Sequence, residues 1–253
     1  MQKLNHYYRT LATGFCFVCF GLGGLLLSLT VLPLQKLFIR DEQRSKAAAR
    51  RTVHRSFGFF LGLMRFTGIF NFDLSARQHL AGVQGKIIIA NHPSLIDVVA
   101  LIAMIPNADC VVKAQLFRNP FMRGVISSTG YISNSDPDKL LDDCTASLKQ
   151  GNNLIIFPEG TRSKPGQPLH FQRGAANIAL RSGCAYIALQ ISCKPSTLTK
   201  EEHWYNVPRS KPTLAIHFLK AIDTAGYYNL SSPSLAARQL TRDLQNYYQQ
   251  ILS

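Results

Sequence analysis

Two short polar segments, each directly after an apolar strand-like run, hold the residues best suited to chemistry. The first, residues 91–97, reads Asn-His-Pro-Ser-Leu-Ile-Asp and follows the run 86–90. The second, residues 157–163, reads Phe-Pro-Glu-Gly-Thr-Arg-Ser and follows the run 153–156. In an open α/β sheet, ligands bind beyond the carboxyl ends of the strands. The two segments are therefore predicted to meet at one edge of a sheet and to form an active site.

The first segment pairs a general base with a carboxylate that can orient it. With His92 on the turn after the strand and Asp97 in the first turn of the next helix, the carboxylate can fold back onto the imidazole ring. Such a contact fixes the ring tautomer and stabilises the imidazolium formed on proton abstraction. The alternative is that Asp97 is only a first-turn acid favoured by the helix dipole. Spacing alone leaves both interpretations open.

Ser94 lies between this His and Asp, so a Ser-His-Asp hydrolase has to be considered. No G-x-S-x-G elbow occurs in the chain, and the Ser94 hydroxyl is expected instead to satisfy a backbone amide at the helix start. The chain also lacks the phosphate-loop and dinucleotide fingerprints and any metal-ligand spacing. We therefore expect no metal and no bound cofactor.

The second segment has the features of an anion clamp. Gly160 permits a turn that a side chain would obstruct. Thr161 and nearby backbone amides can donate to an anion, and Arg162 can fork onto phosphate oxygens. Glu159 is expected to orient Arg162 or a sugar-like hydroxyl. Taken by itself, the segment is better explained as a strand-end turn closed by a Glu–Arg salt bridge.

Together the two segments resemble the motifs of the lysophospholipid acyltransferases, the family of 1-acylglycerol-3-phosphate acyltransferases. The family's first motif, Asn-His-x-x-x-x-Asp, is met by Asn91, His92 and Asp97, and its third motif is met at every position from Phe157 to Ser163. The resemblance covers roughly residues 75–220. Further family-like positions are Lys113, Leu116, Pro120, Gly124, Gly130, Phe171 and Gly174.

The resemblance implies an O-acyltransferase of phospholipid biosynthesis. A fatty acyl chain would pass from acyl-CoA or acyl-carrier protein to the hydroxyl of a lysophospholipid such as 1-acylglycerol-3-phosphate, without a covalent enzyme intermediate. His92 would be the general base and Asp97 its orienting partner, while backbone amides near the two turns would stabilise the oxyanion. The residues implied in substrate binding are Asn91, Lys113, Asn134, Glu159, Gly160, Thr161 and Arg162.

Two positions depart from the family pattern. Asn134 occupies the place of an Arg that helps to hold the acceptor phosphate, and Ala188 occupies the place of a Pro in the fourth motif. Losing one Arg–phosphate pair removes a contact worth roughly 1.5–3 kcal/mol. The same chemistry on an amino-acid lipid, a glycolipid or a pathway-specific lipid therefore stays open. A non-catalytic membrane-binding protein is a further alternative, which the intact His92 and Asp97 oppose.

The elements that must position these residues alternate along the chain as in an α/β fold. We predict a mostly parallel sheet flanked by helices, in a catalytic domain of residues 72–253 that follows a membrane-anchoring region of residues 1–71. Expected strands are 86–90, 110–113, 153–157, 185–191 and 213–219, and expected helices are 94–105, 137–150, 172–182 and 234–252. Asp136 and Ser234 are the expected helix caps.

The N-terminal region is predicted to bind a membrane. Residues 11–32 are almost wholly apolar and long enough to span about 30 Å of hydrocarbon, although Pro33 and nearby glycines could bend the helix back. Residues 36–65 are basic, which places the catalytic domain on the cytoplasmic face, at the inner membrane if the protein is bacterial. Residues 57–70 suit an interfacial helix.

Composition limits the partners. The formal net charge of +14 favours anionic partners, and the cations cluster beside the apolar helices, so we expect an anionic membrane and not nucleic acid. The other expected partners are the lysolipid acceptor and the acyl thioester donor, including acyl-carrier protein. The six scattered cysteines imply no disulfide framework and fit a reducing compartment.

Overall fold

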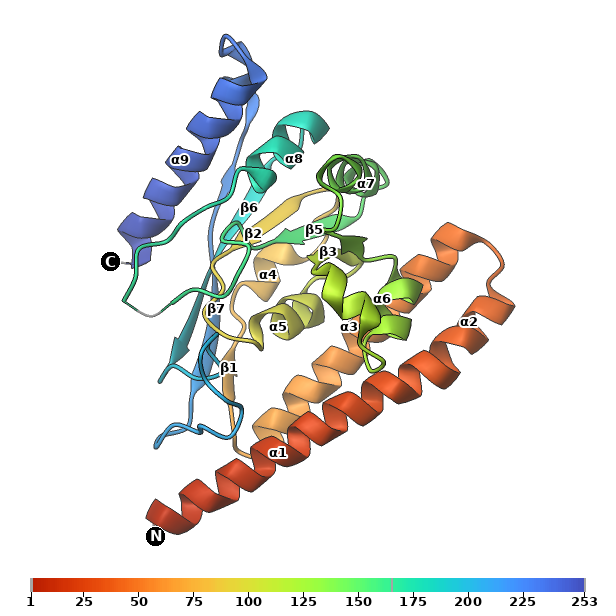
Figure 1. Cartoon of the computed structure of the whole chain (residues 1–253), viewed down its shortest axis with the longest axis vertical. Coiled ribbons are helices and arrows are strands. Elements are labelled where there is room, and N and C mark those ends of the chain that lie inside the picture. The colour runs from red at the N-terminus through yellow and green to blue at the C-terminus, as the bar shows by residue number, and fades with distance from the viewer. Residues whose placement is uncertain (1, 165, 253) are drawn as a thin grey trace.

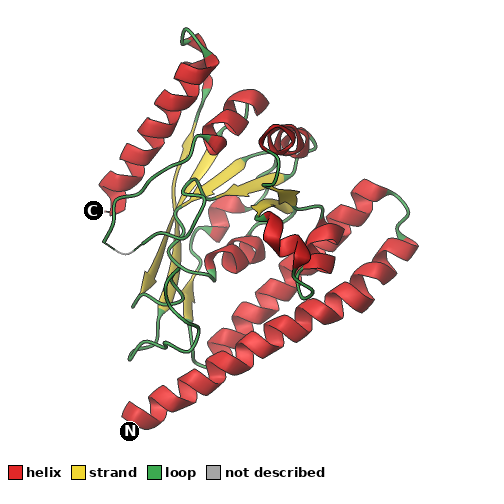
Figure 2. Cartoon of the chain, viewed as in Figure 1, coloured by secondary structure: helices red, strands yellow, loops and turns green. Residues whose placement is uncertain are grey.

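The computed structural model describes residues 2–164 and 166–252, which form a seven-stranded sheet with helices on both faces (Figures 1 and 2). The strand order is β1-β7-β6-β2-β5-β3-β4. Every neighbouring pair is parallel except β6 and β7, which are antiparallel, so the predicted fold class is confirmed. The strands are β1 (Asn71–Asp73), β2 (Ile87–Ala90), β3 (Ala108–Val112), β4 (Ile132–Ser133), β5 (Asn153–Ile156), β6 (Tyr186–Lys194) and β7 (Thr213–Ile222).

The helices form two groups, one on each face of the sheet. Helices α7, α8 and α9 cover one face, while α3 to α6 cover the other and α1 and α2 lie outermost on that side (Figure 1). The helices are α1 (Gln2–Leu26), α2 (Leu32–Phe38), α3 (Glu42–Phe66), α4 (Arg77–Leu80), α5 (Asp97–Met104), α6 (Arg123–Thr129), α7 (Pro137–Lys149), α8 (Gly174–Ser182) and α9 (Pro233–Leu252). Shorter turns are η1 (Leu27–Val31), η2 (Ala114–Arg118) and η3 (Ala225–Asn229).

The central strand β2 shows why the sheet is buried on both faces. Successive side chains of a strand point to opposite sides. Ile87 and Ile89 pack in the hydrophobic core shared with α7, α8 and α9, whereas Ile88 and Ala90 pack in the core shared with α3 and α5. All four are inaccessible to solvent. An apolar run of this kind is typical of a parallel strand covered by helices on both sides.

The N-terminal helical stretch is longer than the predicted apolar span of residues 11–32. Helix α1 continues through the π-helical turn η1 into α2, so the chain reverses only after Phe38 and not at Pro33. Pro33 has no N–H to donate to the carbonyl four residues earlier, and the π-turn directly before it absorbs this defect. Asp41 then begins α3 by accepting a hydrogen bond from the Arg44 amide.

The first helices expose a continuous apolar surface. Residues 3–38 form a helical stretch that is long and apolar enough to cross a membrane. Only 11% of its most apolar 18 residues are buried against the rest of the protein. The outward side chains of α1 and η1 recur with helical spacing and are 54–75% exposed: Leu11, Phe15, Val18, Leu22, Leu26 and Leu29. Helix α3 adds Phe59 and Phe66, which are 75% and 87% exposed. Unpartnered apolar surface of this extent indicates membrane association.

Helix α3 is also fixed to the catalytic sheet by a buried ion pair. Arg50 Nη2 lies 2.9 Å from Asp109 Oδ2 at the start of β3, and Arg50 Nε donates to the Thr129 carbonyl. Ser147 of α7 donates a further hydrogen bond to the same carboxylate. Burial raises the pKa of Asp109, while the charge of Arg50 and the Ser147 hydroxyl oppose the increase. Removing one partner of such a pair would leave a buried charge uncompensated.

Several local predictions need correction. Strands β1 and β4 and helices α4 and α6 were not predicted, and α5 begins three residues later than expected. Helix α3 ends at Phe66, so the expected interfacial segment is shorter by four residues. Helix α9 begins at Pro233, and its cap is the Ser232 hydroxyl, which accepts a hydrogen bond from Leu235 N; Ser234 is not the cap. Asp136 caps α7 as predicted.

Candidate active site

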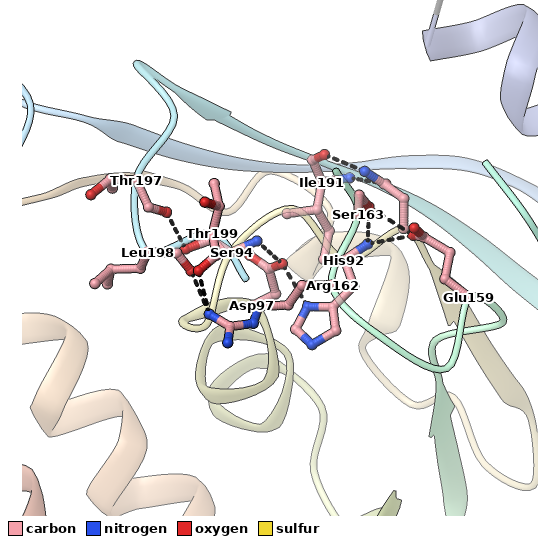
Figure 3. Close-up of polar contacts among 11 residues, drawn as sticks. His92, Ser94, Asp97, Glu159, Arg162, Ser163, Ile191, Thr197, Leu198 and Thr199 are labelled. Carbon is pink, nitrogen blue, oxygen red and sulfur yellow. Dashed lines mark hydrogen bonds and ion pairs between the residues drawn. The ribbon is translucent and has the colours of Figure 1, made fainter. Parts of the chain in front are cut away.

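Sheet topology brings the two polar segments together. Strands β2 and β5 are parallel neighbours with Ile89 in register with Ile156, so the segments after them leave the same edge of the sheet. The two turns are bonded directly, because Ser163 N donates to the His92 carbonyl at 2.7 Å. Figure 3 shows the resulting cluster, in which His92 and Asp97 lie beside Glu159, Arg162 and Ser163.

The His92 ring is held by a carboxylate on one side and by an aromatic ring on its face. His92 Nδ1 lies 2.9 Å from Asp97 Oδ2, and the imidazole stacks on Phe157 with ring centroids 4.1 Å apart. The Asp97 side chain is fully buried, whereas 14% of the His92 side chain is exposed. The ionised carboxylate only accepts hydrogen bonds, which assigns the proton to Nδ1 and leaves Nε2 as a proton acceptor.

Asp97 combines an unfavourable environment with specific partners. Burial raises the pKa of Asp97, and hydrogen bonds from His92 and from the Ser94 amide, with the positive charge of Arg162, oppose that increase. The Ser94 amide donates to the same Oδ2 atom at 2.7 Å. The second oxygen, Oδ1, is buried without a hydrogen-bond partner in the described chain. The carboxylate therefore depends on its contacts with His92, the Ser94 amide and Arg162 to offset its burial.

Glu159 does not make the contact with Arg162 that the sequence suggested. Its Oε1 atom accepts hydrogen bonds from the His92 amide at 3.0 Å and from the Ser163 hydroxyl at 2.8 Å. The side chain therefore ties the second turn to the first and fixes the backbone of the base. Burial raises the pKa of Glu159, while the Ser163 and His92 hydrogen bonds oppose the increase. No Glu159–Arg162 ion pair occurs within residues 2–164 and 166–252.

Arg162 is held beside the dyad by backbone carbonyls. Its Nη1 donates to the Leu198 carbonyl at 2.9 Å and to the Thr199 carbonyl at 2.7 Å. These bonds occupy one nitrogen of the guanidinium fork, whose planar geometry suits bidentate binding of phosphate. Gly160 adopts a φ of +66° in the turn before it, a conformation that other residues rarely adopt. Thr161 is half-buried between them.

The other predicted binding residues have different surroundings. Asn91 is buried and exchanges two 2.8 Å hydrogen bonds with the backbone of Ile191 on β6, so its amide is used within the protein. Lys113 follows β3 and Asn134 follows β4, and both are exposed at the same edge of the sheet as His92. Asn134 Oδ1 accepts a hydrogen bond from the Ala114 amide, which joins these two strand ends.

Sequence reasoning missed the contribution of the segment after β6. Its carbonyls at Leu198 and Thr199 hold Arg162, and the Thr197 carbonyl accepts a 3.0 Å hydrogen bond from the Ser94 hydroxyl. The prediction that this hydroxyl caps α5 is therefore wrong. Thr197 lies 103 residues after Ser94, and Leu198 lies 36 residues after Arg162, so no local pattern reveals these partners. Phe157 was read only as a motif position, although its ring supports the base.

The described residues hold no group of three or more His, Cys, Asp and Glu side chains that could bind a metal ion. All six cysteines are free thiols. The site as built consists of a base with its carboxylate, a bridging glutamate and a positioned arginine.

Comparison with known proteins assigns this arrangement to a family. The profile of the family described as Acyltransferase matches residues 71–192. A 1-acyl-sn-glycerol-3-phosphate acyltransferase of Helicobacter pylori is 31% identical over 195 residues, which cover 74% of this chain and 73% of the relative. The chain belongs to the 1-acylglycerol-3-phosphate acyltransferase family. It is therefore an O-acyltransferase by family.

More distant relatives agree with this assignment. The human 1-acyl-sn-glycerol-3-phosphate acyltransferase beta is 26% identical over 192 residues, which cover 72% of this chain and 64% of the human protein. The crystal structure of the 1-acyl-sn-glycerophosphate (LPA) acyltransferase PlsC from Thermotoga maritima shares the fold, with a TM-score of 0.68 over 98% of both chains at 20% identity. The acyltransferase fold thus includes the N-terminal helices.

Proposed function

We propose that this acyltransferase moves a fatty acyl chain from a thioester, acyl-CoA or acyl-carrier protein, to the hydroxyl of a lysophospholipid such as 1-acylglycerol-3-phosphate. The observation that carries the proposal is the 2.9 Å contact between His92 Nδ1 and the buried Asp97 carboxylate. It leaves Nε2 unprotonated, as a general base requires. The name of the Helicobacter relative, which specifies this acceptor, supports the same reaction.

The reaction needs no covalent intermediate on the protein. As the acceptor oxygen attacks the thioester carbonyl carbon, His92 Nε2 takes the hydroxyl proton, and Asp97 stabilises the imidazolium that forms. The tetrahedral oxyanion then collapses, the C–S bond breaks, and the proton passes from His92 to the departing thiolate. Backbone amides of the turn around Gly160 are the candidates for stabilising the oxyanion.

The acceptor phosphate is assigned to cations at the same sheet edge. Arg162 lies beside the dyad, with its guanidinium on the side of the Leu198 and Thr199 carbonyls, and it keeps N–H groups beyond those bonded to them. Lys113, exposed after β3, supplies a second positive charge. In this arrangement Glu159 and Asn91 position backbone, whereas Arg162 and Lys113 contact substrate.

An apolar cavity provides space for a hydrocarbon chain near the base. The cavity has a volume of about 300 Å³ and is lined by Leu95 and Ile96, which lie between His92 and Asp97 in the chain. Helices α1 and α3 form its far wall, with Phe17, Phe20 and Phe60 among the lining residues. An acyl chain that enters from the membrane between these helices would end with its carbonyl near His92.

Asn134 supports a second candidate acceptor. The residue is exposed and neutral, and its side-chain oxygen accepts a hydrogen bond from the Ala114 amide, so it offers no charge to a phosphate. A lysolipid without a terminal phosphate, such as an amino-acid lipid or a glycolipid, would lose less binding free energy from the presence of Asn134 in place of an Arg. The chemistry at His92 would be unchanged.

The proposed location is the cytoplasmic face of a membrane. The exposed cations are Lys36 in α2, Arg40 before α3, and Arg44, Arg51 and Arg55 in α3, which packs against α1 and α2. Anionic lipids of a cytoplasmic leaflet would attract these cations by about 1 kcal/mol each near the surface. The acceptor lysolipid and the protein would then share one leaflet.

The decisive assay uses purified protein in lipid nanodiscs. A panel of lysolipids, including 1-acylglycerol-3-phosphate and neutral acceptors, is offered with acyl-CoA and, separately, with acyl-carrier protein, and products are identified by mass spectrometry. We expect a diacyl product from the wild type and at least about a hundredfold less from His92→Ala. Equal product from both proteins would overturn the proposed mechanism.

A further inference from the structure

The connection between β6 and β7, residues 195–212, contacts both the active site and the membrane-facing helix α1. We call these residues the β6–β7 loop. Among connections between neighbouring strands of a hairpin, one of this length is unusual and is often functional. Its beginning supplies groups to the site described above, and its middle and end pack on α1. It is therefore a physical link between the two.

At its beginning the loop determines where Arg162 lies. The carbonyls of Leu198 and Thr199 accept both hydrogen bonds of Arg162 Nη1, and the Leu198 carbonyl also accepts one from Leu95 N, two residues before Asp97. Thr197, Leu198 and Thr199 are all at least 94% buried. The orientation of the guanidinium is thus set by loop backbone and not by a side-chain partner.

Leu198 adopts a strained conformation at this point. Its φ of +55° lies in the left-handed region, which bulky side chains disfavour, so the surrounding contacts must hold it there. Its side chain lines the apolar cavity while its carbonyl bonds Arg162. A small shift of the loop would therefore change the arginine position and the cavity wall together.

In its middle and at its end the loop packs on α1. The Trp204 ring lies against Gly14, where an added Cβ would come within 3.1 Å of it, and its centroid lies 6.0 Å from that of Phe17. Arg9, buried to 3% exposure, donates to the carbonyls of Pro208 and Arg209. These contacts fix the loop to the same helix that carries the exposed apolar stripe.

The tip of the loop exposes aromatic rings beside that stripe. Trp204 and Tyr205 are 45% and 50% exposed, although large aromatic side chains are usually more buried than this. Gly14 and Phe17, which Trp204 contacts, are each adjacent in sequence to stripe residues Phe15 and Val18. Half-exposed Trp and Tyr next to an apolar surface are typical of the headgroup layer of a bilayer.

We propose that the β6–β7 loop binds the interfacial layer of the membrane through Trp204 and Tyr205, and that this contact positions Arg162 for the acceptor headgroup. The occupant of the surface is the lipid bilayer on which α1 lies. The assignment of Arg162 to the headgroup rests on the proposed function, whereas the membrane contact of Trp204 does not. Trp204 is in this sense a positioning residue.

The membrane contact can be measured directly because Trp204 is the single tryptophan of the chain. Full-length protein is reconstituted into vesicles whose phosphatidylcholine carries bromine either near the carbonyl end or near the methyl end of its chains. We expect the carbonyl-end bromine to quench Trp204 fluorescence more strongly. Absence of quenching by both lipids would overturn the proposal, whether or not the protein is active.

The link to Arg162 is measured by hydrogen–deuterium exchange and does not require turnover. In bilayer nanodiscs compared with detergent, amides of residues 160–163 and 197–199 should exchange more slowly in the wild type. In Trp204→Ala this difference should disappear. Tyr228→Ala is the matched control, because Tyr228 is also 50% exposed but contacts α8 on the opposite face of the sheet. Unchanged protection in Trp204→Ala would overturn the link.

Steady-state kinetics measure how loss of the Trp204 membrane contact affects acceptor binding. In nanodiscs, Trp204→Ala should raise the acceptor KM by about tenfold and leave kcat and the donor KM unchanged, as expected for loss of acceptor positioning alone. With a short-chain acceptor in detergent, wild type, Trp204→Ala and Tyr228→Ala should have equal KM. A loss of kcat in both environments would mean that Trp204 only maintains the fold. Failure of the proposed function would instead remove turnover in every variant, including the wild type.

Discussion

His92 Nδ1 lies 2.9 Å from Asp97 Oδ2, although the two residues are five positions apart and could not share one face of a helix. The contact forms because α5 begins only at Asp97. Residues 92–96 are therefore not helical, and their backbone can bend the carboxylate back onto the ring. The Ser94 amide donates to the same oxygen and closes that turn. The carboxylate thus fixes both the backbone of the segment and the ring of the base.

This relationship predicts unequal losses at the two positions. His92→Ala should reduce kcat by a factor of about 10²–10⁴ because the proton acceptor is removed. Asp97→Asn should reduce it less, because the ring remains and loses only the group that orients it. Steady-state rates in nanodiscs, with circular dichroism to establish folding, measure both. Near wild-type turnover by folded His92→Ala would contradict the assignment of the base.

A second prediction concerns Glu159, whose pKa is raised by burial. A raised pKa means that the folded protein binds the Glu159 proton more tightly than the unfolded chain does. The free energy of unfolding that this group contributes is therefore fully present below about pH 4.5, the ordinary value, and is lost as the pH rises through the folded pKa. Burying the ionised form consequently costs stability at neutral pH.

Glu159→Gln removes this titration and keeps an acceptor oxygen for the His92 amide and the Ser163 hydroxyl. The Tm of wild type relative to Glu159→Gln should therefore increase as the pH falls from neutral towards 4.5. Thermal unfolding followed at both pH values measures the difference. A Tm difference that does not vary with pH would show that Glu159 titrates normally in the folded protein.

Sequence indicated the fold and the location of the site because both depend on local patterns. The apolar run before His92 and the run before Phe157 could be read as buried strands, and parallel strands bring their carboxyl ends to one edge. Strands β1 and β4 could not be read, because three and two residues give no periodicity. Their pairing with β7 and β3 is what makes them strands.

The partners within the site were harder to predict than its members. Glu159 was expected to orient either Arg162 or a sugar-like hydroxyl, yet it accepts hydrogen bonds from His92 and Ser163, because the pairing of β2 with β5 brings these donors close. Arg162 in turn is bonded to carbonyls at Leu198 and Thr199. The left-handed conformation of Leu198 is imposed by tertiary contacts, since leucine has no local preference for it.

Acceptor selectivity should respond to charge at Asn134. Its exposed side chain lies at the end of β4, at the same sheet edge as Arg162 and Lys113. Asn134→Arg should improve use of 1-acylglycerol-3-phosphate by roughly tenfold to a hundredfold if the new pair contributes about 1.5–3 kcal/mol. Arg162→Ala should raise the KM strongly for an anionic lysolipid and hardly for a neutral one.

The measurement is kcat/KM for a panel of lysolipids with one fixed donor. Asn134→Gln is the control, because it keeps a neutral amide and changes only the length. If the wild type already prefers 1-acylglycerol-3-phosphate and Asn134→Arg impairs its use, the position does not contact the phosphate. The idea of a different acceptor would then fail, and the phosphatidate-forming reaction would stand.

Membrane association should depend on exposed aromatic residues of α3 as well as on α1. Phe59 and Phe66 are 75% and 87% exposed, so replacing both by Ser should leave the core intact. Partition into vesicles should weaken, and the remaining binding should become more sensitive to salt, because a larger share of it then comes from the attraction between basic residues and anionic lipid, which salt screens. Tyr228→Ser, on the far side of the sheet, should partition as the wild type does. Equal partition of all three proteins would contradict an interfacial role for α3.

The contact between α1 and the catalytic domain depends on which glycine of a neighbouring pair faces inward. A Cβ added at Gly24 would lie 2.7 Å from the Phe121 carbonyl oxygen, a backbone atom that cannot rotate away, whereas one added at Gly23 would meet nothing within 4 Å.

Gly23→Ala should be neutral or stabilising, since alanine restricts the unfolded chain and favours the helix. Gly24→Ala gains the same preference but must separate α1 from the loop before α6. Its free energy of unfolding should be lower than that of Gly23→Ala by about 1–3 kcal/mol, the usual cost of overpacking. Thermal unfolding in the same detergent compares the two directly, and equal stabilities would show that α1 is not packed against Phe121.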